Sequence, residues 1–326
     1  MNGRLVKWAD ATVHVASHGL HYGSGVFEGV RAYETAGGSS IFRLTDHLQR
    51  LHDSARLLGM RLPYSVEELR LATIELVAAN GLAECYLRPI AFYGFGELGV
   101  SPRGNPVDVA VISWPWGAYL GEDGQRDGIR AKISSWQRVG PNVIPHVAKA
   151  TGIYLNSMLA TTEARRAGYE EGILLTDAGT VADGPGENIF VVKDGVIRTP
   201  PLSTSILPGI TRDSVTTIAG ELGYVVEQGD LIRADLVLAD EVFMTGTAAD
   251  VAVFDPAGFA ELYAIMSAQR NTRLLGTFAR LNRRDGKPQY LRHQPRIWTY
   301  LNRSLAHPAL ADFRQWYAAN VPPPGS

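Results

Sequence analysis

Residues 144–154 read Ile-Pro-His-Val-Ala-Lys-Ala-Thr-Gly-Ile-Tyr, and they place one lysine, Lys149, among small apolar neighbours. An apolar run that is typical of a strand precedes Lys149, and residues 154–166 have the apolar spacing of a helix. The lysine is therefore expected at a strand-to-helix corner. No carboxylate occurs in the ten residues before it or the thirteen after it. Such surroundings favour the neutral amine, which can attack a carbonyl and form a Schiff base. The alternative is a surface lysine near a turn, where most lysines lie.

A second stretch carries two carboxylates. Residues 181–190 read Val-Ala-Asp-Gly-Pro-Gly-Glu-Asn-Ile-Phe, so that Asp183 and Glu187 stand among two glycines and a proline before an apolar strand. Taken alone, this pattern is that of a tight turn, in which aspartate before glycine is common.

Two further stretches are candidate phosphate sites. Residues 207–213, Leu-Pro-Gly-Ile-Thr-Arg-Asp, predict a glycine turn that opens a helix at Thr211, where exposed N–H groups suit a phosphate. Residues 243–249, Phe-Met-Thr-Gly-Thr-Ala-Ala, predict an apolar strand that ends in small hydroxylated residues. An ordinary capped helix is the alternative for the first stretch.

In this order and spacing, the four stretches resemble the class IV family of pyridoxal-phosphate aminotransferases, and among them the branched-chain amino-acid aminotransferases. The resemblance runs from about residue 3 to residue 253. It implies an α/β (α+β) protein of fold type IV, with two α/β domains and the cofactor between them.

The resemblance also implies that pyridoxal 5'-phosphate forms a Schiff base with Lys149, whose freed amine then acts as the general base. Tyr154 is expected to bond the phenolic oxygen of the cofactor. Asp183 stands where the family has a glutamate for the ring nitrogen; it is one methylene shorter, and Glu187 is the second choice. The implied cofactor-binding residues are Arg50, Lys149, Tyr154, Asp183, Glu187, Leu207, Ile210, Thr211 and Thr247.

The implied substrates are branched-chain L-amino acids and 2-oxo acids, with 2-oxoglutarate as acceptor. By the same resemblance, apolar walls, groups for the α-carboxylate and groups for the distal carboxylate of glutamate come from Tyr22, Phe27, Gly29, Arg31, Tyr86, Arg88, Trp116, Tyr119, Thr247 and Ala248. Taken singly, each of these residues is more often structural than functional.

Two other functions stay open. A D-amino-acid or amine aminotransferase would share the fold, although residues 25–31, Gly-Val-Phe-Glu-Gly-Val-Arg, favour the branched-chain enzyme. An inactive chimera is the other, because of Asp183 and because the family's closing C-terminal helix has no counterpart after residue 253.

Composition sets wider limits. The chain has 326 residues, 45% of them hydrophobic, and a single cysteine, so that an intrachain disulfide is excluded and a cytoplasmic location is compatible. No signal peptide and no membrane-spanning run is recognisable. His18 and His21 have a spacing that could hint at a metal, but without cysteine or acidic partners nearby they are interpreted as loop histidines, and no metal is expected.

The chain carries a charge asymmetry. Residues 255–326 hold ten Lys/Arg and four Asp/Glu, a net +6 within a chain of net −2. This arginine-rich tail is expected to be helical. It resembles the C-terminal end of a sugar kinase of the aminoglycoside-phosphotransferase type, on residues 276–281, 284–287 and 290–291, without the kinase's catalytic residues. The charge is also compatible with a nucleic-acid-binding arm, but a solvated helical face is preferred because the charges form no block.

These signals predict four segments: a small α/β domain over residues 1–118, a linker over 119–127, a large cofactor-binding domain over 128–254 and the foreign tail over 255–326. A homodimer is implied by the family, with residues 97–100 reaching the partner's site. The expected elements are a short strand near Val13, a helix capped by Thr45, a helix with a capping box at Ser65, strands at 86–92, 107–114, 172–176 and 241–244, a hairpin over 189–199 and a helix over 211–222.

Overall fold

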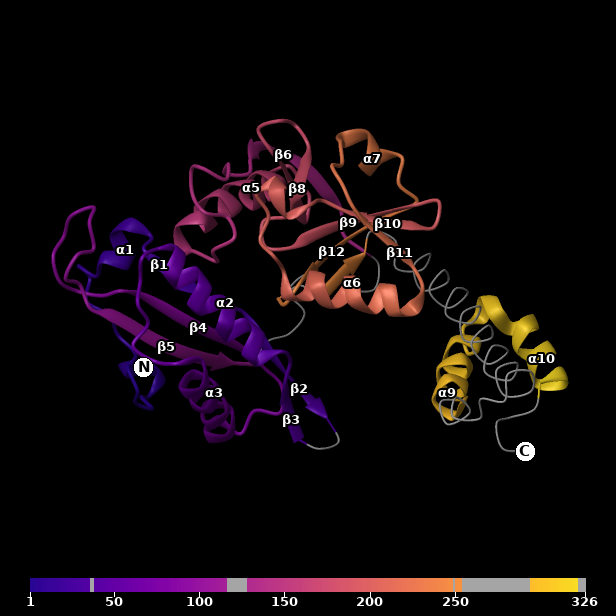
Figure 1. Ribbon diagram of the computed structural model, residues 1–326, viewed down its shortest axis with the longest axis horizontal. Coiled ribbons are helices and arrows are strands. Elements are labelled where there is room, and N and C mark those ends of the chain that lie inside the picture. The colour runs from indigo at the N-terminus through magenta and orange to yellow at the C-terminus, as the bar shows by residue number, and fades with distance from the viewer. Residues whose placement is uncertain (36–37, 116–127, 249, 254–293, 322–326) are drawn as a thin grey trace, which may run out of the picture. The chain divides into compact units, whose positions relative to one another are not determined.

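The computed structural model describes residues 1–35, 38–115, 128–248, 250–253 and 294–321 (Figure 1). Two compact units make up the chain. The first comprises Met1–Thr216 and Val226–Phe254, and the second comprises Thr217–Val225 and Asp255–Ser326. The predicted linker lies outside the described residues, and the boundaries predicted at residues 118, 127 and 254 stay predictions.

An antiparallel sheet organises the N-terminal part of the first unit. Its central strand β4 (Cys85–Tyr93) pairs with β1 (Gly25–Phe27), β2 (Val30–Thr35) and β5 (Val107–Trp114), and β2 also pairs with β3 (Gly38–Ile41). Buried and half-buried residues alternate along most of β4, as expected for a strand with one covered face. The strands predicted at 86–92 and 107–114 are confirmed.

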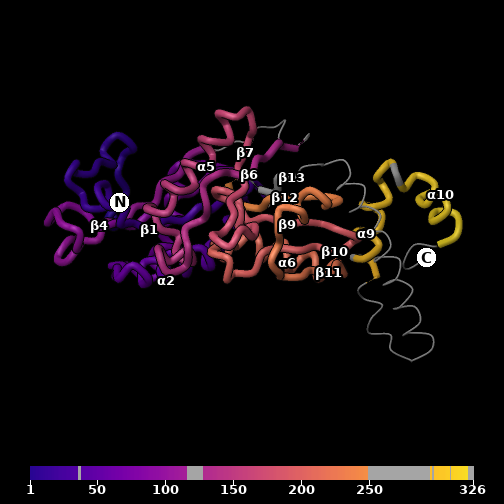
Figure 2. The backbone as a smooth tube through the Cα atoms, turned by 90° about the horizontal axis from the view of Figure 1, so that it is seen from above, coloured from indigo at the N-terminus to yellow at the C-terminus, as the bar shows by residue number. Residues whose placement is uncertain are grey.

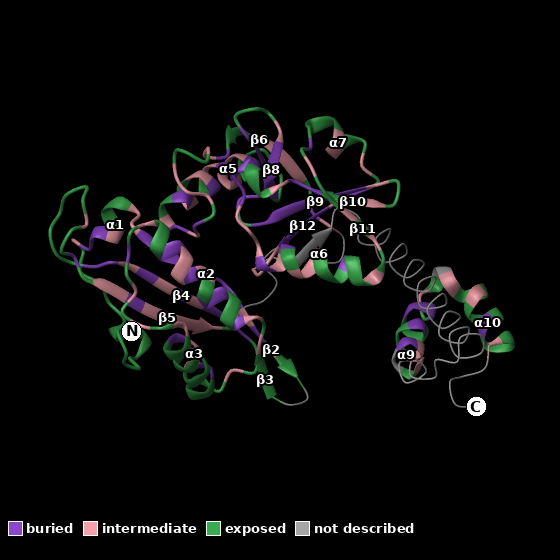
Figure 3. Ribbon diagram, in the orientation of Figure 1, coloured by how far each residue is buried: buried purple, intermediate pink, exposed green. Residues whose placement is uncertain are grey.

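Two helices cover this sheet. Helix α2 (Leu44–Leu57) packs on β1 and β4, α3 (Val66–Asn80) packs on β5, and the two helices contact each other. Figure 3 shows the resulting buried stripe on α2. The core between helices and sheet is formed by Leu48, Leu51, Ala55, Leu69, Val77, Leu87, Ala91 and Val109.

N-caps were predicted for both helices, at Thr45 for α2 and at Ser65 for α3. Ser65 accepts a hydrogen bond from Glu68 N, and the Glu68 carboxylate accepts one from Ser65 N, so the predicted capping box is confirmed. The cap predicted at Thr45 is wrong, because α2 begins at Leu44 and Arg43 takes the N-cap position with a left-handed backbone. Arg43 instead forms an ion pair with Asp46 in the first helical turn.

The rest of the first unit holds two more sheets. The strand order in the larger sheet is β11-β10-β9-β12-β13, and in the smaller it is β6-β7-β8. Figures 1 and 2 both show β9, β10 and β12 side by side. The strands are β6 (Ala131–Gln137), β7 (Glu171–Leu175), β8 (Val181–Asp183), β9 (Asn188–Lys193), β10 (Val196–Thr199), β11 (Val225–Gln228), β12 (Glu241–Gly246) and β13 (Asp250–Val253), and the helices are α5 (Tyr154–Arg166), α6 (Ile210–Leu222) and α7 (Arg233–Val237).

These elements confirm the helices and strands predicted after residue 150, including the hairpin. Its turn residues Asp194 and Gly195 both have positive φ, 49° and 76°, which is the backbone that a two-residue hairpin turn requires. The core beneath the smaller sheet and β9 is aliphatic and includes Ile173, Val181 and Ile189.

Three further local predictions are wrong: the strand near Val13, the loop position of His18 and His21, and the strand before Lys149. No strand occurs near Val13, and the histidine-containing block forms a short helix, α1 (His18–Tyr22). The apolar run before Lys149 is a series of turns with two prolines rather than a strand, and a 3-10 turn, Thr151–Ile153, separates the lysine from α5. His18 is buried and bonds Ser24 Oγ (2.6 Å) and the Gly99 carbonyl (2.7 Å), so it orders two loops.

In the second unit, α9 (Gln294–Leu305) and α10 (Ala311–Asn320) share a small core of Ile297, Leu301, Leu305 and Tyr317. Of the tail predicted to be helical, residues 294–320 are helical apart from a short connection, and residues 255–293 lie outside the described residues. Among the residues that the structure describes, no helix combines the length and apolarity that a bilayer crossing requires.

Candidate active site

The loop that carries Lys149 is bound to the N-terminal sheet through its backbone. Lys149 N donates to Ser54 Oγ of α2 (3.0 Å), and Phe27 N donates to the Lys149 carbonyl (3.1 Å). Ala150 forms an isolated bridge with Val26. The direction of the lysine is therefore set by β1 and α2, more than 90 residues earlier in the chain.

A close backbone approach holds the next turn of the same loop. Gly152 N and Thr151 Oγ1 both donate to the Gly23 carbonyl, at 3.1 Å and 2.7 Å. Gly23 has φ +62°, and a Cβ there would lie 2.8 Å from the Gly152 Cα. Glycine is required at residue 23 both for its conformation and for space.

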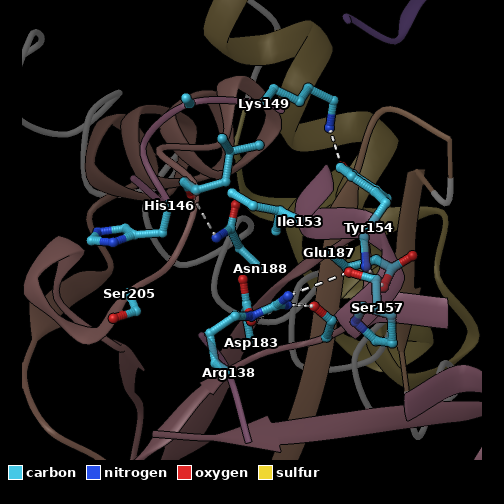
Figure 4. Close-up of a pocket in the computed structure, with 15 residues that line it drawn as sticks. Arg138, His146, Lys149, Ile153, Tyr154, Ser157, Asp183, Glu187, Asn188 and Ser205 are labelled. Atoms are coloured by element: carbon cyan, nitrogen blue, oxygen red, sulfur yellow. Dashed lines mark hydrogen bonds and ion pairs between the residues drawn. The ribbon is translucent and has the colours of Figure 1, made fainter. Parts of the chain in front are cut away.

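The lysine amine faces Tyr154 on the first turn of α5. Lys149 Nζ lies 2.6 Å from the Tyr154 hydroxyl oxygen, and a dashed line marks this hydrogen bond in Figure 4. The Phe27 ring packs edge-on against Tyr154, with ring centroids 4.7 Å apart, and Nζ lies 5.1 Å from the Phe27 centroid. Two aromatic rings thus flank an amine that lines a pocket.

The Asp183 carboxylate lines the same pocket and is paired with Arg138, which was not among the residues predicted from the sequence. Arg138 donates to Asp183 Oδ1 from Nε (2.8 Å) and from Nη2 (2.5 Å), and Nη2 also reaches the Gly184 carbonyl. Both side chains are buried. Burial raises the pKa of Asp183 to about 6, against the opposing attraction of Arg138 and Lys149. The pair places a carboxylate that is largely ionised at neutral pH in the pocket.

Glu187 is the other acid in the pocket, and its environment is different. Its Oε2 accepts a hydrogen bond from Gly186 N (3.0 Å), and the side chain is buried. Burial raises the pKa of Glu187 to about 8, and the nearby Glu171 and Asp183 carboxylates add to this shift. Between the two predicted candidates, Asp183 is the one that carries charge more readily at neutral pH.

The residues predicted to hold a phosphate meet at the start of α6. Arg50 Nη1 donates to the Pro208 carbonyl (2.8 Å), directly before Ile210 opens the helix. The Thr211 and Thr247 hydroxyl oxygens are 3.5 Å apart. The start of a helix with an arginine and two hydroxyls beside it is a typical anion-binding arrangement.

The turn before α6 is shaped by Asn188. Asn188 Nδ2 donates to the Leu207 carbonyl (3.0 Å), and a Cβ at Gly209 would lie 2.0 Å from Asn188 Oδ1. The glycine in this turn therefore allows the side chain of Asn188 to hold Leu207 at the pocket wall.

Arg50 is itself held by an acid, Glu28, that was not predicted from the sequence. Glu28 accepts bonds from Arg50 Nε (2.7 Å) and Nη2 (2.8 Å), and its Oε2 is also 2.8 Å from His47 Nδ1. Glu28 and His47 are buried. Arg50 lowers the pKa of Glu28 to about 2 despite its burial, whereas burial lowers the pKa of His47. The only sequence signal was a lone carboxylate between two apolar strands.

Several residues predicted to bind substrate lie on the strands beside Lys149. The Arg88 guanidinium lies over the Phe27 ring at 4.6 Å, and Arg88 Nη2 donates to the Tyr86 hydroxyl (3.1 Å). A Cβ at Gly29 would lie 2.0 Å from that hydroxyl, so the glycine makes room for Tyr86. The structure thus brings Phe27, Gly29, Tyr86 and Arg88 to one place next to Lys149 and Tyr154.

The other residues predicted to bind substrate have fewer contacts with this group. Arg31 pairs with Tyr86 across β2 and β4, and Ala248 follows Thr247 in the turn after β12. Tyr22 contacts the His18 ring at 4.5 Å and is exposed, so its prediction stays a prediction. Trp116 and Tyr119 lie outside the described residues.

The chain is similar to known proteins over most of its length. The protein-family model for class IV amino-transferases matches residues 25–253. The branched-chain-amino-acid aminotransferase of Escherichia coli (strain K12) is 50% identical over 251 residues, which cover 77% of this chain and 81% of that relative.

Solved structures match as well. A crystal structure of the branched-chain amino acid aminotransferase of E. coli has a TM-score of 0.76 at 50% identity, covering 77% of this chain and 83% of that one. A second branched-chain amino acid aminotransferase, from T.th. and complexed with N-(5'-phosphopyridoxyl)-L-glutamate, has a TM-score of 0.74 at 49% identity, covering 78% and 83%. The chain therefore belongs to the class IV aminotransferase family.

Proposed function

We propose that this protein transfers the amino group of branched-chain L-amino acids to 2-oxoglutarate, with pyridoxal phosphate bound through Lys149. The observation that carries the proposal is the Lys149 amine, 2.6 Å from the Tyr154 hydroxyl in a pocket that also contains Asp183. Half of the residues matched in the E. coli branched-chain enzyme are identical in this chain.

The donor set fits the cofactor. Arg50, the start of α6 and the hydroxyls of Thr211 and Thr247 would hold the phosphate, and Ile210 would contribute its backbone N–H. Leu207 would pack on the ring. Pyridoxal phosphate, when bound, supplies an aldehyde that condenses with amines and an aromatic ring that accepts electrons.

The protein's own groups would direct the protons. Lys149 Nζ would be the amine that holds the cofactor through its aldehyde, and the same amine would take the proton from the α-carbon of the amino acid as general base. Asp183, kept in place by Arg138, would hold the proton on the ring nitrogen, and Glu187 is the second choice. The Tyr154 hydroxyl would donate to the phenolic oxygen.

The substrate pocket would be shared between apolar and charged groups. Phe27 and Gly29, with Trp116 and Tyr119, would wall the branched side chain. Tyr86 and the backbone amides of Thr247 and Ala248 would bind the α-carboxylate, and Tyr22, Arg31 and Arg88 the distal carboxylate of glutamate. The T.th. relative is complexed with a phosphopyridoxyl glutamate, which supports glutamate as a partner in the reaction.

Reduction with borohydride tests the cofactor attachment. Treatment of the protein with pyridoxal phosphate and then borohydride should leave a phosphopyridoxyl group on Lys149, located by peptide mass spectrometry. The purified protein should be yellow, and Lys149→Ala should lose both the colour and the label. A colourless wild-type protein would favour the inactive chimera instead.

Separate assays with leucine and D-alanine decide the substrate. Activity with leucine and 2-oxoglutarate is expected. Activity confined to D-alanine would favour the D-amino-acid or amine aminotransferase that shares this fold.

We further propose a homodimer in which residues 97–100 reach the partner's site. An exposed apolar surface supports it: Val15 is 72% and Val100 87% exposed, and the His14 and Phe95 rings, 4.2 Å apart, join the two loops. Large exposed apolar surfaces commonly mark interfaces. Light scattering should give twice the chain mass of 35.4 kDa; a mass of one chain would contradict the dimer.

The domain division at residues 118, 127 and 254, the kinase-like origin of the tail and a cytoplasmic location are proposals of the same kind. The family match ends at residue 253, and the single cysteine, Cys85, is buried. Limited proteolysis should cut first within residues 119–127 and near residue 254 if these boundaries are correct.

A further inference from the structure

Arg50 depends on an acid that lies outside the substrate pocket. The Glu28 carboxylate accepts from both Nε and Nη2 of Arg50, at 2.7 Å and 2.8 Å, which is the bidentate geometry that fixes the plane of a guanidinium. Arg50 Nη1 then points to the Pro208 carbonyl at the start of α6. The Arg50 guanidinium is therefore hydrogen-bonded on one side by the Glu28 carboxylate and on the other side by the Pro208 carbonyl in the turn before Ile210.

Glu28 is itself held by hydrogen bonds of its backbone and of its side chain. Its backbone N–H donates to the Pro89 carbonyl of β4 (2.8 Å), and its side chain is fully buried. His47 Nδ1 lies 2.8 Å from Glu28 Oε2. Since an ionised carboxylate only accepts hydrogen bonds, His47 Nδ1 carries the proton and donates it. Both carboxylate oxygens are engaged, so neither is left over for a ligand.

We propose that Glu28, supported by His47, is a positioning residue that orients the Arg50 guanidinium for the phosphate of pyridoxal phosphate. This inference rests on the proposed function. Arg50 has five N–H donors, and Glu28 and Pro208 engage three of them. Within the part of the chain that the structure describes, this leaves one donor on Nη1 and one on Nη2 for an anion. Pre-orientation of such a fork lowers the ordering cost of binding.

The rival explanation is an ion pair that only stabilises the fold. The preference of the protein for pyridoxal phosphate over pyridoxal distinguishes the positioning role from a purely structural one. The quantity to measure is the ratio of the dissociation constants of pyridoxal and pyridoxal phosphate for the cofactor-free protein, since a purely structural loss changes both constants alike.

The experiment compares Glu28→Gln, Arg50→Gln, the double variant and the control Glu163→Gln, which removes a carboxylate paired with Lys132 away from the pocket. We expect Glu28→Gln to lower the ratio about tenfold, the equivalent of one charged hydrogen bond, with pyridoxal binding changed by less than about twofold. In the Arg50→Gln background, Glu28→Gln should lower the ratio no further. Glu163→Gln should keep the wild-type ratio.

An unchanged ratio in Glu28→Gln, or an equal loss with and without Arg50, would overturn the positioning role. Should Glu28→Gln not fold, Glu28→Asp keeps the charge but ends one methylene short of Arg50, and it must then lower the ratio. A wild-type protein that forms the Lys149 adduct but shows no phosphate preference contradicts this inference alone. A wild-type protein that forms no adduct contradicts the proposed function itself.

Discussion

The Arg138 guanidinium donates two hydrogen bonds to a single oxygen of the Asp183 carboxylate, from Nε at 2.8 Å and from Nη2 at 2.5 Å. The partners are 45 residues apart in sequence and both are buried. Arg138 therefore counteracts the burial that raises the pKa of Asp183, and its hydrogen bonds fix the position of the Asp183 carboxylate. The pair thus sets the charge and the place of the acid that we propose for the ring nitrogen of the cofactor.

Arg138→Gln is expected to raise the pKa of Asp183 above about 6, by roughly 1–3 units, because it removes the nearest cation from a buried carboxylate. The measurement is a carboxyl carbon NMR titration of the cofactor-free protein, with Asp183→Asn to assign the signal. A pKa that stays where it is in the wild type would mean that Arg138 does not control the charge of Asp183.

Tyr154→Phe removes the hydroxyl that lies 2.6 Å from Lys149 Nζ. We expect kcat with leucine to fall about tenfold, since one hydrogen bond is lost at the reacting groups, while borohydride still labels Lys149. Tyr169→Phe, at a tyrosine that contacts Arg130 on the surface, is the control and should keep the wild-type kcat. An equal fall in both variants would argue against a specific role for Tyr154.

The low pKa of Glu28 makes a prediction for acid stability. Its pKa is about 2 in the folded protein and 4.5 in the unfolded chain, so the unfolded state binds more protons between these values. The stability from this group is present above pH 4.5 and is lost as the pH falls through about 2. The wild type should have a larger free energy of unfolding than Glu28→Gln above pH 4.5. This difference between the two proteins should shrink by about 3 kcal/mol as the pH falls from 4.5 to about 2. Urea titrations from pH 5 downward measure it, and a margin independent of pH would contradict the assignment.

The raised pKa of Glu187 predicts a stability that changes with pH in the opposite direction. Its folded pKa of about 8 lies above the value of 4.5 for the unfolded chain, so the stability from its protonated form is full below pH 4.5 and is lost as the pH rises through about 8. Glu187→Gln imitates the neutral acid and can still accept from Gly186 N. The cofactor-free variant should therefore become more stable than the wild type as the pH rises from 4.5 to 8. A variant less stable than the wild type at pH 8 would show that Glu187 is needed as an anion.

Gly23→Ala tests the close approach behind Lys149. Alanine at φ +62° costs about 1–2 kcal/mol anywhere, and here its Cβ would also lie 2.8 Å from the Gly152 Cα. Gly59→Ala is the matched control, because Gly59 has φ +66° and open space around it. Gly23→Ala should lower the free energy of unfolding more than Gly59→Ala and should slow the labelling of Lys149. If both variants lost the same free energy of unfolding, the positive φ alone would explain the loss, and the close contact between residues 23 and 152 would contribute nothing.

Local patterns were sufficient for two features whose contacts join neighbours in the chain. The capping box at Ser65 and Glu68 and the turn at Asp194 and Gly195 were predicted correctly, because their hydrogen bonds and backbone angles are set within a few residues. The turns before Lys149 were mistaken for a strand. Pro141 and Pro145 lack the N–H that a sheet needs. Val143 and Val147 are exposed, and Ile144 and Ala148 are the residues of this run that pack in a core cluster.

By itself, the sequence determined the class of chemistry: the lysine in its apolar loop, the acid-containing turn and the glycine turn before Thr211 already indicated the family, because these motifs are short and continuous. Only the tertiary structure decided which charges meet. Arg138 reaches Asp183, and Glu28 reaches Arg50, through strand pairing and helix packing that bring distant residues within 3 Å. Such pairs depend on long-range packing, and no spacing along one chain encodes it.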